Sequence, residues 1–189
     1  MSIGLWVRGA RPKTLVTSIA SVMVGAVMAY VHIERSGTCI AIYPEPASCA
    51  TAREQQTLLM DRFWPVTILC LLVALFLQIA VNYANDYSDG IRGTDAGRDT
   101  DESKSGKPQR LTASGLVPAK HVLFAAMICA AIACICGVVA VVLAQAWWLL
   151  AVGVASLLAG WFYTGGKHPY GYVGLGEVGV FLFFGLAAV

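Results

Sequence analysis

The sequence predicts an all-α fold, a polytopic transmembrane helix bundle with four full spans and a truncated fifth. Hydrophobic residues make up 58% of the 189 residues and charged residues only 13%, where a soluble domain usually has about 25% charged residues. Several uncharged runs are long enough to cross a bilayer. The net charge of +2 is too small to indicate nucleic-acid binding.

The first two spans follow from uncharged runs separated by a charged segment. Residues 14–33 form 20 residues without a formal charge, about 30 Å of helix and one bilayer core. Residues 63–85 form the second run. Because proline suits a first helical turn and tryptophan a membrane interface, the pair Trp64–Pro65 predicts that this helix begins there. The intervening residues 34–62 are expected to form an extracytoplasmic loop.

The last spans lie in a long run without charge, residues 121–166. Its 46 residues predict two helices, with a turn around Gln145 and an interface at Trp147 and Trp148. A further apolar segment runs from Val178 to the end of the sequence. Its 12 residues reach only about 18 Å. We therefore expect a single domain over 1–189 that is incomplete at its C-terminus.

Orientation follows from the positions of lysine and arginine. Ten of the 13 lie in the N-terminal flank, in the loop after the second span or in the loop after the fourth. These parts, including an aspartate-rich loop over 86–120, are predicted to be cytoplasmic in the cell (inner or plasma) membrane. Cys39 and Cys49 then lie outside, where a disulfide can form and free thiols are the alternative.

The candidate site begins with polar residues at the end of the second span. Asn82, Asp86 and Asp89 are spaced four and three apart, which stacks them on one helical face. We expect Gly90 and Gly93 to break the helix. Carboxylates at a helix C-terminus oppose the helix dipole and are costly near a membrane, so they indicate function. Two carboxylates suit Mg²⁺, which takes its other ligands from water and phosphate. An acidic helix end without function is the alternative.

A basic segment follows in the same loop. Arg110 has a planar guanidinium that matches phosphate, and Lys104 and Lys107 flank it as point charges. A cytoplasmic loop carries such cations in any case. Beside an acidic, metal-binding face, they indicate the second half of a diphosphate site.

Four motifs resemble one family. They are RPKTL (11–15), NDYSDGIRGTD (85–95), PQRLTASG (108–115) and YTGG followed by PYGYVGLGE (163–177). Together they resemble the UbiA-type intramembrane prenyltransferases, most closely those that act on 1,4-dihydroxy-2-naphthoate in menaquinone biosynthesis. The resemblance implies nine transmembrane helices around a cavity and two aspartate-rich loops that bind a prenyl diphosphate through Mg²⁺.

The resemblance also assigns roles to individual residues. It implies metal binding and catalysis by Asp86 and Asp89, and catalysis through diphosphate binding by Arg110. The expected substrate-binding residues are Asn82, Asn85, Asp95, Lys107, Tyr163 and Lys167, of which the last two match a tyrosine-x-x-x-lysine pattern.

The implied function is magnesium-dependent transfer of a polyprenyl group to 1,4-dihydroxy-2-naphthoate with decarboxylation, giving demethylmenaquinone. The alternatives are another aromatic acceptor (4-hydroxybenzoate or homogentisate), a transporter, and a non-catalytic half-length membrane protein. After Lys120 the only acidic residue is Glu177, so the second aspartate-rich motif of the family is missing. We therefore expect the 189 residues alone to be inactive.

Overall fold

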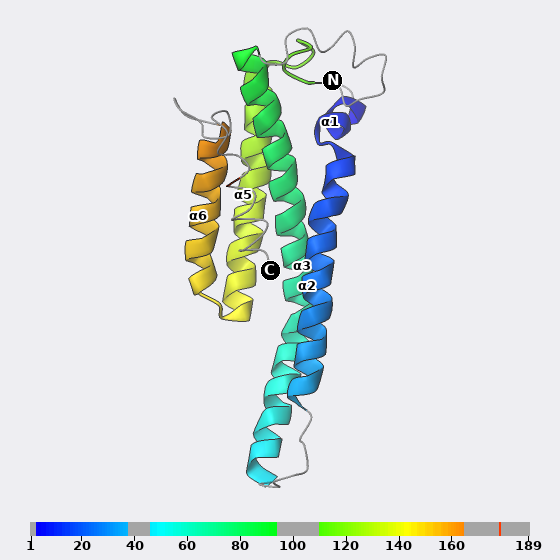
Figure 1. Cartoon of the computed structure of the whole chain (residues 1–189), viewed down its shortest axis with the longest axis vertical. Coiled ribbons are helices and arrows are strands. Elements are labelled where there is room, and N and C mark those ends of the chain that lie inside the picture. The colour runs from blue at the N-terminus through cyan, green and yellow to red at the C-terminus, as the bar shows by residue number, and fades with distance from the viewer. Residues whose placement is uncertain (1–2, 38–45, 94–109, 165–177, 179–189) are drawn as a thin grey trace.

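The regular structure in the described part of the chain is helical. The computed structural model describes residues 3–37, 46–93, 110–164 and 178. Its helices are α1 (Ile3–Gly9), α2 (Pro12–Ser36), α3 (Pro46–Arg92), α5 (Ala119–Ala144) and α6 (Trp148–Thr164). They run up and down beside one another, and α2 and α3 project beyond α5 and α6 at one end (Figure 1). The predicted helical membrane bundle is confirmed.

Three of the described helices are long and apolar enough to span a bilayer: α2, the part of α3 from Cys49 to Arg92, and α5. α6 is apolar but has only 17 described residues, about 25 Å of helix. The predicted turn at Gln145 is confirmed, because α5 ends at Ala144 and Gln145 adopts a left-handed φ of 57°. The predicted fifth segment, apart from Val178, lies outside the described residues.

The start of α3 differs from the prediction. The expected loop over 34–62 is helical from Pro46 onward, and the helix continues through Pro65 instead of starting there. An interior proline removes one helical hydrogen bond. The residues before it, however, are rich in alanine, arginine, glutamine, leucine and methionine, which favour helix. With 47 residues, α3 is about 70 Å long, more than twice the thickness of a bilayer core.

Two hydrogen bonds fasten the projecting part of α3 to its neighbours. Gln56 donates from Nε2 to the carbonyl oxygen of Glu34 at 3.0 Å. Arg62 donates from Nη1 to the carbonyl oxygen of Leu143 at 3.2 Å. The second bond places a cation at the C-terminus of α5, where the helix dipole favours positive charge.

One cluster of buried apolar side chains lies at the opposite end of α3, against α1. This core cluster consists of Ala10, Tyr83, Leu111, Val117, Val122 and Ala126. The rings of Trp6 and Tyr83 meet edge to face, with centroids 5.6 Å apart and planes at 88°. The Tyr83 hydroxyl also donates to the carbonyl oxygen of Trp6 at 2.9 Å. By contrast, α2 has no buried residue. The chain is therefore packed most tightly where the polar residues of α3 lie.

Gly9→Ala is expected to destabilise this end of the bundle by about 1–3 kcal/mol. A Cβ at position 9 would lie 2.5 Å from Cδ1 of Leu111. Leu111 is fully buried, so its side chain can move aside only by displacing its packed neighbours. Gly4→Ala is the matched control, because nothing lies within 4 Å of its added Cβ. Thermal unfolding in detergent should show a lower Tm only for Gly9→Ala, and equal Tm values would contradict the packing argument.

Candidate functional site

The polar face of α3 forms as predicted, because the helix continues to Arg92. Asn82, Asp86 and Asp89 therefore lie on one side of it. The expected break at Gly90 is wrong, and the helix ends before Gly93, whose φ is +70°. Gly90 instead allows close packing: a Cβ there would lie 2.4 Å from the Thr112 side chain. One interior glycine costs only about 1 kcal/mol of helix stability, which packing can offset.

Asn82 connects the polar face to the junction between α1 and α2. Its side chain is buried. Its Nδ2 donates to the carbonyl oxygen of Ala10 at 2.8 Å and to Oγ1 of Thr14 at 3.0 Å. The amide nitrogen of Asn82 thus donates to groups within the protein. Oδ1 is the atom through which Asn82 can accept a hydrogen bond from a substrate. Asn85 lies half-buried on the same helix.

Asp86 connects the polar face to the turn that follows Arg110. Only 2% of the residue is exposed. Its Oδ2 accepts the Leu111 N–H and its Oδ1 accepts the Thr112 N–H, both at 2.9 Å. These bonds bring the backbone beside the half-buried Arg110 to the end of α3 that carries Asp86 and the half-buried Asp89. The start of the predicted basic segment therefore lies beside the acidic face, and its role in binding diphosphate stays a prediction.

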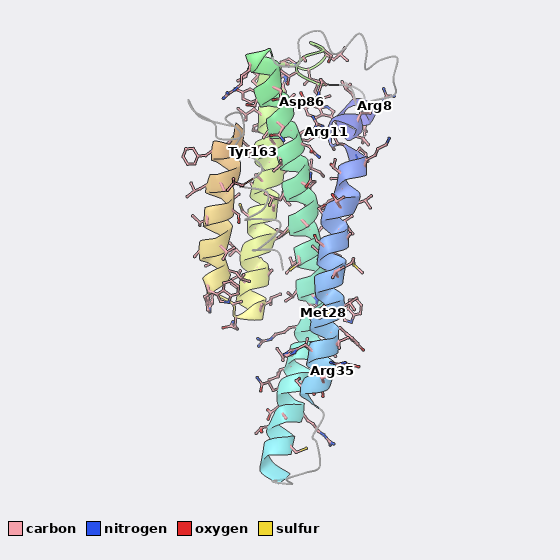
Figure 2. The ribbon with its side chains drawn as sticks, in the orientation of Figure 1. Arg8, Arg11, Met28, Arg35, Asp86 and Tyr163 are labelled. Carbon is pink, nitrogen blue, oxygen red and sulfur yellow. The ribbon has the colours of Figure 1, made fainter. Side chains whose placement is uncertain are left out.

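Arg11 is a candidate binding residue that the sequence interpretation missed. It precedes α2 with φ 52° and ψ 69°, a left-handed conformation that costs about 1–2 kcal/mol for a residue with a Cβ. Its Nη2 is buried and has no hydrogen-bond partner within the described residues. Figure 2 shows Arg11 at the same end of the bundle as Asp86. Because a buried donor without an acceptor is costly, this atom points to an anionic ligand.

One signal for Arg11 is present in the sequence. The RPKTL motif places a cation directly before a proline at the first helical position. In the sequence interpretation Arg11 counted toward the positive flank and the RPKTL motif but received no binding role. A second polar atom, Oγ1 of Thr112 in the turn held by Asp86, is likewise buried without a hydrogen-bond partner in the described part of the chain.

The other predicted site residues are only partly described. Tyr163 is half-buried near the end of α6, at the same end of the bundle as Asp86 (Figure 2). Asp95, Lys107 and Lys167 lie outside the described residues. Cys49 is disulfide-bonded, and its predicted partner Cys39 also lies outside them. The pairing and the roles of these residues stay predictions.

The donor set suits a metal shared with a substrate. Within the described residues, no group of three or more histidine, cysteine, aspartate or glutamate side chains is placed to hold a metal ion. Asp86 and Asp89 supply two carboxylates one helical turn apart. Mg²⁺ commonly binds one or two carboxylates and completes its coordination with water and phosphate oxygens. Each Asp86 oxygen accepts one backbone N–H bond, which leaves lone pairs for a metal.

A cavity of about 420 Å³ lies between α2, α3 and the end of α5, away from this site. It is lined mainly by small and apolar side chains, among them Gly25, Ala26, Ala29 and Val66. Among the described residues, Arg62 is the one charged residue in its lining. Because no carboxylate of the described residues accompanies this arginine in the lining, the cavity does not suit the binding of a metal-bound diphosphate.

Comparison with known proteins points to one family. Residues 57–189 match the UbiA prenyltransferase family. A 1,4-dihydroxy-2-naphthoate octaprenyltransferase of Mycobacterium tuberculosis is 42% identical over 188 residues, covering 100% of this chain and 52% of the relative. The protein of the same name from Mycobacterium leprae is 39% identical, with the same coverage. The one from Escherichia coli is 30% identical over 97% of this chain and 51% of the relative.

The chain spans about half the length of the curated relatives it matches. No solved structure matches it. The family match covers the polar face of α3, the turn after Arg110 and α6, whereas Arg11 lies before it. The alignments with the two mycobacterial relatives extend over the whole chain and so include Arg11.

Proposed function

Because this chain belongs to the UbiA prenyltransferase family, we propose that the protein transfers a polyprenyl group from a polyprenyl diphosphate to 1,4-dihydroxy-2-naphthoate. The observation that carries the proposal is the 42% identity, over the whole chain, to a relative named for that acceptor. The geometry agrees with it. An acidic pair and two arginines gather at one end of membrane-length helices, where a diphosphate can lie at the interface while its apolar chain extends into lipid.

The residues of the site divide into two roles. Asp86 and Asp89 would hold Mg²⁺, which when bound supplies positive charge to the departing diphosphate. Arg11 and Arg110 bind the diphosphate oxygens directly, because a guanidinium matches phosphate with two parallel hydrogen bonds. Asn82 fixes the backbone before Arg11 through its bond to Ala10.

The proposed chemistry separates charge in a place with little water. The bond between the prenyl carbon and the diphosphate oxygen breaks, and its electron pair leaves with the diphosphate. The electron-rich ring of the acceptor supplies the pair for the new carbon–carbon bond, and loss of the carboxyl group as CO₂ restores aromaticity. The arginines stabilise the negative charge that develops on the diphosphate. Exclusion of water by the surrounding helices protects the allylic cation from hydrolysis.

We propose that the end of the bundle carrying Asp86 faces the cytoplasm. Lysine and arginine concentrate in the segments that join the helices at that end. In this orientation the projecting start of α3 lies on the outer side of the cell membrane, together with the disulfide-bonded Cys49.

The test is a transfer assay on membranes that contain the protein expressed from its native gene. Polyprenyl diphosphate is supplied with 1,4-dihydroxy-2-naphthoate, 4-hydroxybenzoate or homogentisate, with Mg²⁺ or with a chelator. We expect a prenylated product and CO₂ from the naphthoate in the presence of Mg²⁺, and no product with the chelator.

Other outcomes of this assay correspond to the alternatives. Transfer to 4-hydroxybenzoate or homogentisate, with the naphthoate unused, would replace the proposed acceptor. Binding of polyprenyl diphosphate without transfer to any acceptor would favour a non-catalytic protein. Absence of both binding and transfer would favour a transporter.

A further inference from the structure

The Asp86 carboxylate holds the backbone of a segment distant in sequence. Leu111 and Thr112 each donate a backbone N–H to one of its two oxygens, at 2.9 Å. Asp86 is 2% exposed and Leu111 is 0% exposed. The Leu111 bond is buried and the Thr112 bond is partly buried, and hydrogen bonds to a charged acceptor are strong where water is scarce.

The turn held in this way has a defined shape. The Val117 N–H donates to the carbonyl oxygen of Leu111 at 3.4 Å, and the Gly115 N–H donates to that of Thr112 at 3.1 Å. Gly115 has φ +70°, which a glycine adopts without strain. We call residues 110–115 the arginine turn, because Arg110 is its first residue.

Two glycines let the arginine turn lie close to the helices on either side. A Cβ on Gly9 of α1 would meet the Leu111 side chain at 2.5 Å, and one on Gly90 of α3 would meet the Thr112 side chain at 2.4 Å. Leu111 also belongs to the core cluster. The turn is thus fixed by packing against α1 and α3 and by its two hydrogen bonds to the Asp86 carboxylate.

We propose that Asp86 is a positioning residue for the arginine turn, in addition to any contact with a metal. Arg110 is covalently joined to the N–H that Asp86 accepts, so fixing that N–H fixes the start of the arginine side chain at the acidic face. The link to Arg110 rests on the proposed function, because it assumes that Arg110 binds diphosphate. The claim that Asp86 holds the arginine turn through two backbone hydrogen bonds does not depend on the proposed function.

The inference predicts a difference between the two aspartates. In Asp86→Asn, one carboxylate oxygen becomes an NH₂ group, which faces a backbone N–H as donor against donor. In Asp89→Asn, Asp86 still accepts the Leu111 and Thr112 N–H groups. Loss of hydrogen bonds to a charged acceptor should speed exchange of the Leu111 and Thr112 amides by about 10- to 100-fold.

The first measurement is hydrogen–deuterium exchange of a peptide covering 110–117, in the whole protein in detergent without divalent metal. Asp86→Asn should exchange faster than wild type, while Asp89→Asn should match wild type. Gly90→Ala keeps both carboxylates and pushes against Thr112, so it should also exchange faster. Gly153→Ala is its control, since nothing lies within 4 Å of that added Cβ. Wild-type exchange in Asp86→Asn would overturn the proposal.

The second measurement is the KM for polyprenyl diphosphate. If Asp86 acted only as a metal ligand, Gly90→Ala would keep the wild-type KM. A positioning role instead predicts a KM raised about tenfold or more in Gly90→Ala, with the Mg²⁺ dependence unchanged. Faster exchange together with an unchanged KM would overturn the link to Arg110. A wild-type protein that transfers no prenyl group would overturn the proposed function, and the exchange result would still decide whether Asp86 fastens the turn.

Discussion

Arg11→Gly is expected to lower kcat/KM for polyprenyl diphosphate by about 10- to 100-fold while the protein stays folded. The variant removes a guanidinium whose buried Nη2 has no acceptor within the described residues. The interaction that is lost should therefore be one with the bound substrate. It also places glycine at φ 52°, which glycine adopts without strain. The Tm should therefore stay the same or rise, as is common when a strained binding residue is removed. Steady-state kinetics and thermal unfolding of one preparation provide both readouts.

Arg8→Ala is the matched control for Arg11→Gly. Arg8 lies three residues earlier at the same end of the bundle, and its side chain is exposed (Figure 2). Arg8 carries the same charge as Arg11, so Arg8→Ala tests whether loss of any cation at this end of the bundle lowers kcat/KM. Wild-type kinetics are expected for Arg8→Ala. Wild-type kinetics for Arg11→Gly would contradict the binding role. A raised KM for the naphthoate alone would assign Arg11 to the carboxylate of the acceptor.

The sequence predicted the parts of the fold that repeat a simple physical pattern. Twenty uncharged residues are sufficient to predict a span, and α2 and α5 lie where such runs were found. The turn at Gln145 was predictable because 46 uncharged residues exceed one bilayer thickness. The stacking of Asn82, Asp86 and Asp89 required only the helical period and a helix that continued to Arg92.

Features that depend on contacts between distant residues were not predictable in this way. The start of α3 was missed because a search for apolar runs ignores a polar helix that continues into the membrane. The contact of Asp86 with Leu111 and Thr112 joins residues 25 and 26 positions apart, and no local pattern encodes it. The inward position of Arg11 depends on a left-handed residue between two helices, whereas charge counting treats every arginine of a flank alike.

Asp89→Asn is expected to lower magnesium-dependent transfer by about 1,000-fold or more, because a metal ion contributes several kcal/mol to stabilising the leaving group. The asparagine keeps the shape of the side chain and removes its charge. Asp86 and its two backbone bonds remain in this variant, so the arginine turn stays in place. The transfer rate should be measured over a range of Mg²⁺ concentrations. A shift of the midpoint to higher Mg²⁺ would identify Asp89 as a metal ligand.

Asp61→Asn controls for the loss of one carboxylate, because Asp61 is exposed in the other half of α3, far along the helix from Asp89. It should leave the rate and its Mg²⁺ dependence unchanged. Wild-type activity of Asp89→Asn at every Mg²⁺ concentration would contradict a metal site on this face. Asp86→Asn alone does not separate the two roles, because it removes a charge and releases the arginine turn together. Asp89→Asn therefore tests metal binding, and Gly90→Ala tests the position of the arginine turn. Asp86→Asn should lower the transfer rate more than Gly90→Ala does, because it also removes a negative charge.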